Sequence, residues 1–231
     1  MTVLRRVRLA RKLIRKNLSY TDRTGEIAFA VIMVIIINGY VALSGLNTGF
    51  LYIVFVNLGA CAAWGFIDGL LYAVSNSIER NDAVNKLKYL TSLSAERDPE
   101  TLDKVENSLD DTFLVSFGKE GKEAIAKDII ANVRQASLKN DRTFTKDDLL
   151  GWLSIEVIYL LTGFFLALPF LVLHDKLLAW FISNFVGVLW LFWYGVQLGR
   201  SAGRHRLLFG IIMSGIGVLF LVSSYIVWVL K

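Results

Sequence analysis

The chain of 231 residues is poor in the side chains from which most metal centres and catalytic sites are built. It has one cysteine, Cys61, and two histidines, His174 and His205, which both lie beside charged loops. A single cysteine excludes a disulfide framework and a cysteine-based metal site within the chain. No glycine-rich phosphate loop before a Lys-Ser/Thr pair and no H-E-x-x-H motif occurs. We therefore expect neither an enzyme nor a tightly bound cofactor.

Proline is also scarce, with 2 residues, whereas glycine is common, with 18, many of them inside apolar runs. Few prolines leave long helices uninterrupted, and glycines let helices approach closely in a membrane. Hydrophobic residues make up 55% of the chain. This composition predicts a membrane protein rather than a soluble domain.

Five apolar runs are long enough to cross a bilayer, which takes about 20 residues. The runs cover roughly 25–45, 50–77, 149–173, 177–198 and 207–230. The segment between the second and third runs is charged and less apolar, and its pattern predicts about three helices. The predicted fold is an all-α polytopic membrane protein with five transmembrane helices and a cytoplasmic helical insert between helices 2 and 3. The predicted domains are 1–20, 25–78, 79–148 and 149–231.

Residues 2–18 are basic and amphipathic, with apolar residues at helical spacing and arginines and lysines on the other sides. The basic part is too long for the n-region of a secretory signal. A nucleic-acid-binding arm and a helix lying on an anionic leaflet are the remaining alternatives. We favour the leaflet, because a membrane span follows directly, and we expect no nucleic-acid partner.

The lysines and arginines near the span ends predict the orientation of the chain. They are concentrated in the N-terminal arm, in the insert and in the loop 199–206, whereas the opposite ends hold only Lys176 and Lys231. Cytoplasmic loops carry the excess of positive charge. The N-terminus and insert are therefore predicted to be cytoplasmic and the C-terminus outside, in a prokaryotic cell membrane.

Three carboxylates fall within or at the start of the apolar runs. Glu26 opens the first, Asp68 lies late in the second, and Glu156 lies about two turns into the third. These depths place all three in the cytoplasmic third of the membrane. An ionisable residue in a membrane is expensive to bury, and by default it marks an ion or proton pathway.

Other polar or sulfur-bearing residues could complete such a site. Met33 follows Glu26 on the same helical face, and Asn38 and Asn57 lie deeper, towards the outer half. Oxygen ligands with a thioether suit a weakly held divalent first-row metal, while the same acids could relay protons. A purely structural role stays open, with Glu26 as a helix cap and Asp68 and Glu156 hydrogen-bonded to Asn57, Asn184, Tyr72 or Trp64.

A second group of acids recurs at helical spacing in the insert. This spacing would form either an acidic face that collects metal or, more commonly, the solvated side of an amphipathic helix. The residues concerned are Glu100, Asp103, Glu106 and Asp110.

Two strings in the first two spans resemble the vacuolar iron transporter family, and in particular its prokaryotic branch. They are DRTGEIAFAVIMV at 22–34 and NLGACAAWGFIDGLLYAVSNSIERND at 57–82. In topology the resemblance covers nearly the whole chain. It implies a homodimer with its pathway between the two copies of span one, and export of a divalent metal from the cytosol coupled to protons. By position it aligns Glu26 with the family's acid at the start of span one and Asp68 with an acid late in span two.

The chain also departs from that family. Met33 stands about where the family has a deeper aspartate in span one, and Trp64 lies in the region of the family's methionine in span two. The insert lacks the repeated E-x-x-E pattern of the family's metal-collecting segment. These departures bear on which metal is carried rather than on the fold.

The predicted function is therefore a proton-coupled transporter that moves a divalent cation, iron or manganese, out of the cytosol through a dimer interface. The alternative is a membrane scaffold that transports nothing and binds partners or lipids through its basic arm and insert. The predicted partners are the lipid bilayer, a second copy of the chain, the cation and protons. Water access to Asp68 separates the two functions, because a transporter requires it and a scaffold does not.

Overall fold

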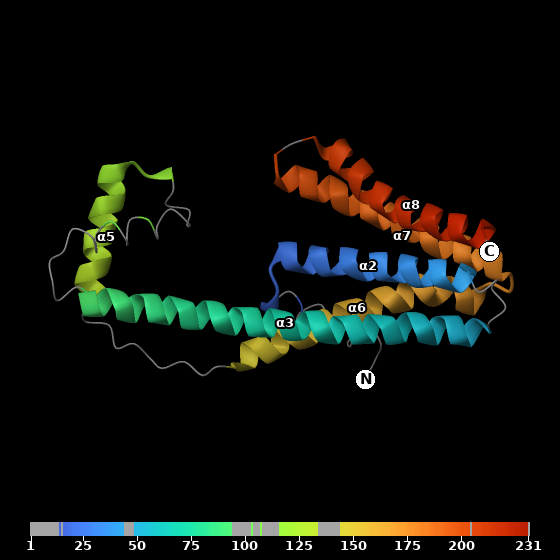
Figure 1. Ribbon diagram of the computed structural model, residues 1–231, viewed down its shortest axis with the longest axis horizontal. Coiled ribbons are helices and arrows are strands. Elements are labelled where there is room, and N and C mark those ends of the chain that lie inside the picture. The colour runs from blue at the N-terminus through green and yellow to red at the C-terminus, as the bar shows by residue number, and fades with distance from the viewer. Residues whose placement is uncertain are drawn as a thin grey trace. The chain divides into compact units, whose positions relative to one another are not determined.

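The computed structural model describes residues 14, 16–43, 49–93, 103, 107, 116–133, 144–203 and 205–230. Within these residues the chain forms six helices and no strand (Figure 1), so the predicted all-α class is confirmed. The helices are α2 (Tyr20–Leu43), α3 (Phe50–Leu93), α5 (Lys119–Val133), α6 (Lys146–Val172), α7 (Lys176–Ser201) and α8 (Arg206–Val229).

Five of the described helices are long and apolar enough to cross a membrane. The candidate spans are Tyr20–Ala42, Phe50–Asp82, Lys146–Val172, Lys176–Ser201 and Arg206–Ser223. Large apolar side chains lie exposed along them, among them Phe55 (69%), Phe165 (62%) and Leu219 (66%). Soluble proteins rarely expose apolar surface on this scale, whereas a bilayer solvates it. The helices therefore indicate an integral membrane protein.

The chain divides into two compact units. One comprises Met1–Ala73 and Lys146–Lys231, and the other comprises Val74–Thr145. We call the first the membrane unit, since it holds α2, the first part of α3, and α6, α7 and α8. All three acids of the predicted spans belong to it.

Helix α2 begins five residues before the predicted span because its start is capped. The Asp22 backbone N–H donates to Ser19 Oγ (3.1 Å), and the Ser19 N–H donates to Asp22 Oδ2 (3.2 Å). This reciprocal pair is a capping box, which satisfies two backbone donors at a helix start. The S-x-x-D spacing was present in the sequence, but the apolar run alone set the predicted boundary.

Helix α3 continues to Leu93, well past the predicted end of the second span near 77. Many of the residues after 78 are charged and suit water rather than lipid, but the helix continues through them. From residue 70 to 93 there is no glycine or proline, the residues that most strongly disfavour a helix interior. The predicted boundary between span and insert is therefore a change of composition within one helix.

The second unit contains α5, which lies in the segment where the sequence predicts about three helices. Lys127 donates a hydrogen bond of 2.6 Å to Glu123 one turn earlier, and this contact lowers the pKa of Glu123. The acidic face predicted in the insert falls mainly outside the described residues, namely at Glu100, Glu106 and Asp110. Asp103 is described as helical and exposed.

The end of the basic arm packs on the membrane unit. Leu18 is buried in the main apolar cluster, and Ile14 packs against that cluster. Tyr72 on α3 donates a hydrogen bond of 3.2 Å to the Asn17 carbonyl. The rest of the arm, 1–13 and 15, lies outside the described residues. The arm's last turn is thus part of the membrane unit rather than only a surface helix.

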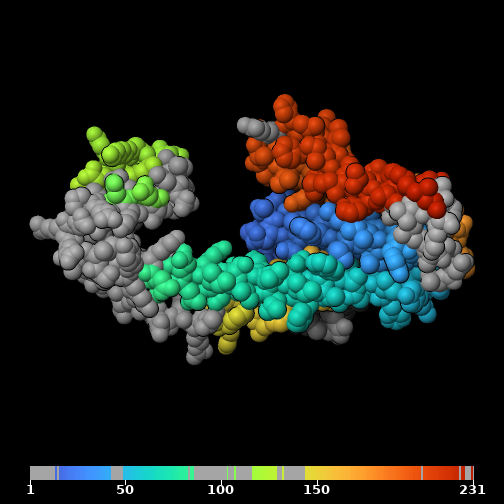
Figure 2. Space-filling model, in the orientation of Figure 1, coloured from blue at the N-terminus to red at the C-terminus, as the bar shows by residue number. Residues whose placement is uncertain are grey.

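Helix α2 is the central element of the membrane unit. It contacts α6, α7 and α8, and Figures 1 and 2 show it lying between α3 on one side and the α7–α8 pair on the other. Its side chains Val31, Val34 and Ile35 are buried in the main apolar cluster. A polar residue on α2 therefore faces other helices from several directions.

Glycines bring two pairs of helices into close contact. A Cβ atom at Gly195 of α7 would strike the Phe209 carbonyl of α8 and lie 2.8 Å from Gly210 Cα. A Cβ atom at Gly65 of α3 would lie 2.8 Å from Tyr159 Cβ of α6. Small residues allow such backbone approach between membrane helices. The second contact matters most here, because it holds α3 and α6 together beside the intramembrane acids.

Candidate functional site

Two of the three predicted acids interact electrostatically, and a tyrosine is hydrogen-bonded to one of them. Tyr159 on α6 donates a short hydrogen bond from its hydroxyl to Asp68 Oδ2 on α3. Glu26 on α2 interacts electrostatically with Asp68 and with Tyr159. We call these three residues the acid cluster. It joins three helices, so it depends on the packed bundle rather than on any one span.

Glu156 lies beside the acid cluster, one turn from Tyr159 on α6. It interacts electrostatically with Cys61 of α3, and its Oε2 atom would lie 2.9 Å from a Cβ atom at Gly65. That oxygen is buried and has no hydrogen-bond partner in the described part of the chain. Glu156 therefore faces α3, as a functional acid would, but towards Cys61 and Gly65 rather than towards Glu26.

The structural alternative for Asp68 named Asn57, Asn184, Tyr72 or Trp64 as partners, whereas the residue that donates to Asp68 is Tyr159. Trp64 is 46% exposed, because α3 faces α6 through Gly65, and adjacent helical residues point about 100° apart. Tyr159 could have been found in the sequence, since it follows Glu156 by three residues and such pairs share a helix face.

Asn57 belongs to a second polar group, nearer the other end of the bundle. Its Nδ2 donates to Asn38 Oδ1 (3.1 Å), and Asn38 Nδ2 donates to Ser183 Oγ (2.9 Å) and Asn184 Oδ1 (3.3 Å). All four side chains are buried. We call them the amide cluster. Ser183 was missed in the sequence, although it and Asn184 interrupt the apolar run of the fourth span.

Backbone carbonyls complete the amide cluster. Ser183 donates to the Leu166 carbonyl of α6 (2.7 Å), and Asn184 donates to the Trp180 carbonyl (2.9 Å). The Trp180 indole N–H in turn donates to the Asn38 carbonyl (2.9 Å). The cluster therefore ties α2, α3, α6 and α7 together through hydrogen bonds between buried groups.

The two clusters lie at different depths. Asp68 follows Asn57 by 11 residues on the same helix, which corresponds to about 16 Å along its axis. Met33 lies between Glu26 and Asn38 on α2 and is partly buried. The predicted set of Glu26, Met33, Asp68, Glu156 and Asn57 is therefore spread over two levels of the membrane.

In the described part of the chain, no three His, Cys, Asp or Glu side chains gather closely enough to hold a metal ion. Glu26 and Asp68 are two such groups, and Tyr159 adds a phenol rather than a third carboxylate. A single copy of the chain thus offers a pair of acids. Such a pair suits a transient cation or a proton better than a resident metal, which takes four or more ligands.

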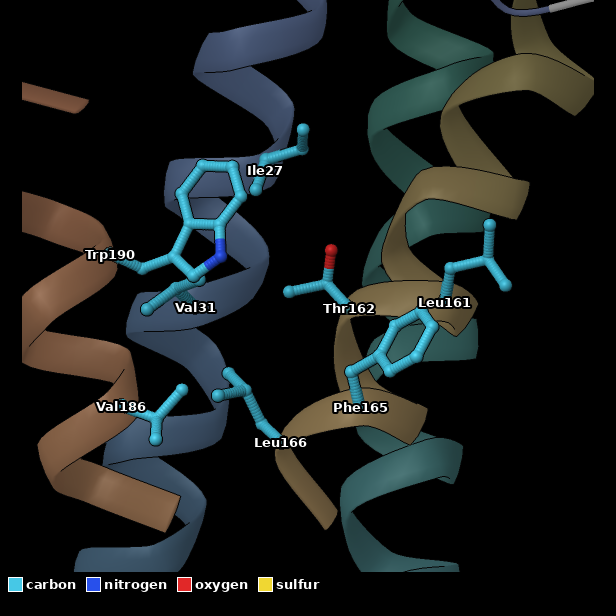
Figure 3. A pocket seen from close by; sticks show the side chains of 8 residues that line it. All are labelled: Ile27, Val31, Leu161, Thr162, Phe165, Leu166, Val186 and Trp190. Carbon is cyan, nitrogen blue, oxygen red and sulfur yellow. The ribbon is translucent and has the colours of Figure 1, made fainter. Parts of the chain in front are cut away.

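A pocket of about 250 Å³ lies between α2, α6 and α7. Figure 3 shows Trp190, Val186 and Val31 facing residues of α6 across it. Its lining is apolar except for Thr162 and the Trp190 indole nitrogen, and it contains no carboxylate. The full lining is Ile27, Val31, Leu161, Thr162, Phe165, Leu166, Val186 and Trp190. It is therefore not a site for a cation.

One sequence pattern is typical of serine hydrolases but does not lie on the structural element that such a site requires. Residues 199–203, GRSAG, match the G-x-S-x-G pattern of serine hydrolases. That pattern is a nucleophile elbow only on a turn from a strand to a helix. Here it closes helix α7, and the described residues contain no strand. Ser201 is thus part of a helix end, not an elbow.

Comparison with models of known protein families and with curated proteins gives no match for this chain. Its function must be argued from its own side chains. The acid cluster, placed inside a five-span membrane unit, is the arrangement best suited to bind a proton or a cation.

Proposed function

We propose that this protein transports a divalent cation across the membrane in exchange for protons, and that the acid cluster is where the two compete. The observation that carries the proposal is the hydrogen bond from Tyr159 of α6 to Asp68 of α3, with Glu26 of α2 in electrostatic range of both. A membrane protein with no use for charge at this depth would be expected to place apolar residues there.

The chemistry of a carboxylate pair supports exchange. Two carboxylates that interact in a medium of low dielectric constant repel each other strongly and need compensating positive charge. Protons or a divalent cation can supply that charge, but both cannot occupy the same oxygens. Binding of one therefore releases the other, which is the requirement for coupled movement in opposite directions.

The resemblance to vacuolar iron transporters supports iron or manganese as the cation and a homodimer as the assembly. In a symmetric dimer each copy presents the same surface. A second acid cluster brought close to the first would double the carboxylates available. We propose that the cation crosses with ligands from both copies, since a pair of acids from one copy is too few for a dehydrated divalent cation.

We propose that the N-terminus and the second unit are cytoplasmic and the turn after α6 is outside, from the distribution of lysine and arginine. Single cysteines at Lys119 of α5 and at exposed His174, in a Cys61→Ser background, should react with an impermeant thiol reagent from opposite sides of the membrane. Labelling of both from one side would exclude this arrangement of spans.

The direct test is flux into proteoliposomes with a panel of divalent cations that includes Fe²⁺ and Mn²⁺. We expect one or more of the panel to enter faster than into protein-free liposomes, and the internal pH to change with cation entry. A protonophore should remove that pH change. If no cation of the panel moves above the protein-free rate, the transport proposal is rejected and the scaffold alternative stands.

A further inference from the structure

Helices α3 and α6 meet along a seam that runs between the amide cluster and the acid cluster. On α3, residues 57, 61 and 65 follow at intervals of four and so share one face. A Cβ atom at Gly163 would lie 2.7 Å from Cys61 Sγ, and one at Gly65 would lie 2.9 Å from Glu156 Oε2. We define the α3–α6 seam as Asn57, Cys61, Gly65, Glu156, Tyr159 and Gly163.

Two buried oxygens in this seam lack hydrogen-bond partners among the described residues. They are Asn57 Oδ1 and Glu156 Oε2. Asn57 is only 1% exposed, so neither bulk water nor a lipid headgroup reaches it. A buried acceptor left without a donor loses the hydrogen bond that it would make in water, which is why nearly all such atoms in proteins are paired with protein or ordered water.

The orientation of the Asn57 amide is fixed by the two acceptors that its nitrogen faces. Its Nδ2 donates to the Ile53 carbonyl (3.0 Å) and to Asn38 Oδ1 (3.1 Å), both of which are acceptors. Exchanging the amide oxygen and nitrogen would set acceptor against acceptor in both contacts. Asn57 Oδ1 must therefore point away from the amide cluster, and its donor must come from elsewhere.

Cys61 lies between the two unpartnered oxygens. It is one turn from Asn57 on α3, it is buried, and it interacts electrostatically with Glu156. A thiol is a weak donor and a weak acceptor. Buried water typically makes two to four hydrogen bonds to groups of this kind, roughly three on average. The seam thus offers one neutral acceptor, one thiol and one carboxyl oxygen in sequence.

We propose that water molecules occupy the α3–α6 seam at Asn57 Oδ1 and at Glu156 Oε2, on either side of the Cys61 thiol. These waters would supply the donors that the two oxygens lack. Water fits better than a metal ion, because the described residues offer no group of three metal-binding acids, cysteines or histidines. Use of these waters by protons rests on the proposed transport function, whereas the hydration of the seam does not.

The single cysteine makes the proposal testable in the intact protein. The S–H stretching band of Cys61 can be followed by infrared spectroscopy after transfer of the protein, in lipid nanodiscs, into D₂O. We expect the thiol to exchange while the backbone amides of the surrounding turns of α3 remain protected. Backbone protection matters because it shows that α3 stays helical during the measurement, so that water reaches the thiol without local unfolding of the helix.

Two glycine variants form a matched pair. Gly163→Ala places a Cβ atom 2.7 Å from Cys61 Sγ, whereas Gly59→Ala, on α3, places one where nothing lies within 4 Å. Gly163→Ala should slow thiol exchange because the added methyl group fills the space beside Cys61, and Gly59→Ala should leave the exchange rate unchanged.

Thiol exchange as slow as that of the neighbouring amides in the parent protein would show a dry seam and overturn the proposal. The same slowing in both variants would mean that helix stability controls exchange, which would also overturn it. The parent measurement decides the question even if Gly163→Ala does not fold. Exchange without any cation flux would reject the transport function while leaving the hydrated seam in place.

Discussion

The Asp68→Asn variant should fold like the parent protein and lose cation flux. The amide is nearly isosteric with the carboxyl group and can still accept the hydrogen bond from Tyr159, and it costs less to bury than a carboxylate. It cannot ionise, so it can neither exchange a proton nor compensate a cation. Contacts to a charged group are worth about 1.5–3 kcal/mol, which corresponds to about a 10–100-fold loss of flux.

The matched control is Asp147→Asn. Asp147 lies in the first turn of α6 and is exposed, so the same chemical change is made outside the acid cluster, and flux should be unchanged. Both variants should be compared for thermal unfolding in detergent and for cation flux in proteoliposomes. Normal flux together with reduced stability of Asp68→Asn would show that the tie to Tyr159 is structural and would reject the acid cluster as the transport site.

The largest loss of stability should follow from replacing Asn38 by leucine. Asn38 is the centre of the amide cluster, and its side chain bonds to Asn57, Ser183 and Asn184. The replacement removes one hydrogen bond from each of these three buried side chains, which keep only their bonds to the backbone carbonyls of Ile53, Leu166 and Trp180. Each bond lost at a buried polar atom costs about 1–3 kcal/mol, and we expect a total loss of about 3–5 kcal/mol, in the range of severe core mutations.

Ser223→Leu serves as the control for that experiment. Ser223 lies on α8, is exposed, and donates only to the Phe220 carbonyl of its own helix (2.9 Å). Removing this local bond should change the unfolding temperature little, since lipid solvates leucine well. If Asn38→Leu is no less stable than Ser223→Leu, the amide cluster does not hold the four helices together.

The acid cluster shows which parts of the candidate site could be predicted from the sequence. Asp68 and Glu156 could be singled out because a carboxylate within an apolar run is costly whatever the fold. Their partners could not be assigned, because the sequence of a single helix does not determine how that helix is rotated against its neighbour. Glu26 and Asp68 are 42 positions apart in the chain, and their meeting depends on how α2 and α3 pack.

The ends of the helices show the same limit on a smaller scale. The start of α2 is set by a capping box between Ser19 and Asp22. The spacing of these two residues can be recognised in the sequence, but whether they form a cap depends on the local backbone geometry. The end of α3 at Leu93 was missed, because hydropathy reports where a helix leaves the membrane rather than where it stops being a helix.

What the sequence by itself determined is the architecture. Five apolar runs of spanning length with few prolines predict membrane helices, since a bilayer lets a backbone satisfy its hydrogen bonds only in helices or closed barrels, and barrel strands are about half as long. The tertiary structure alone decided which polar groups meet. Side chains such as Tyr159 and Cys61 are ordinary residues in an apolar run, and they face polar atoms of the neighbouring helix only because glycines at 65 and 163 let α3 and α6 approach closely. Ser183 likewise gains its partners only where α7 packs on α2 and α6.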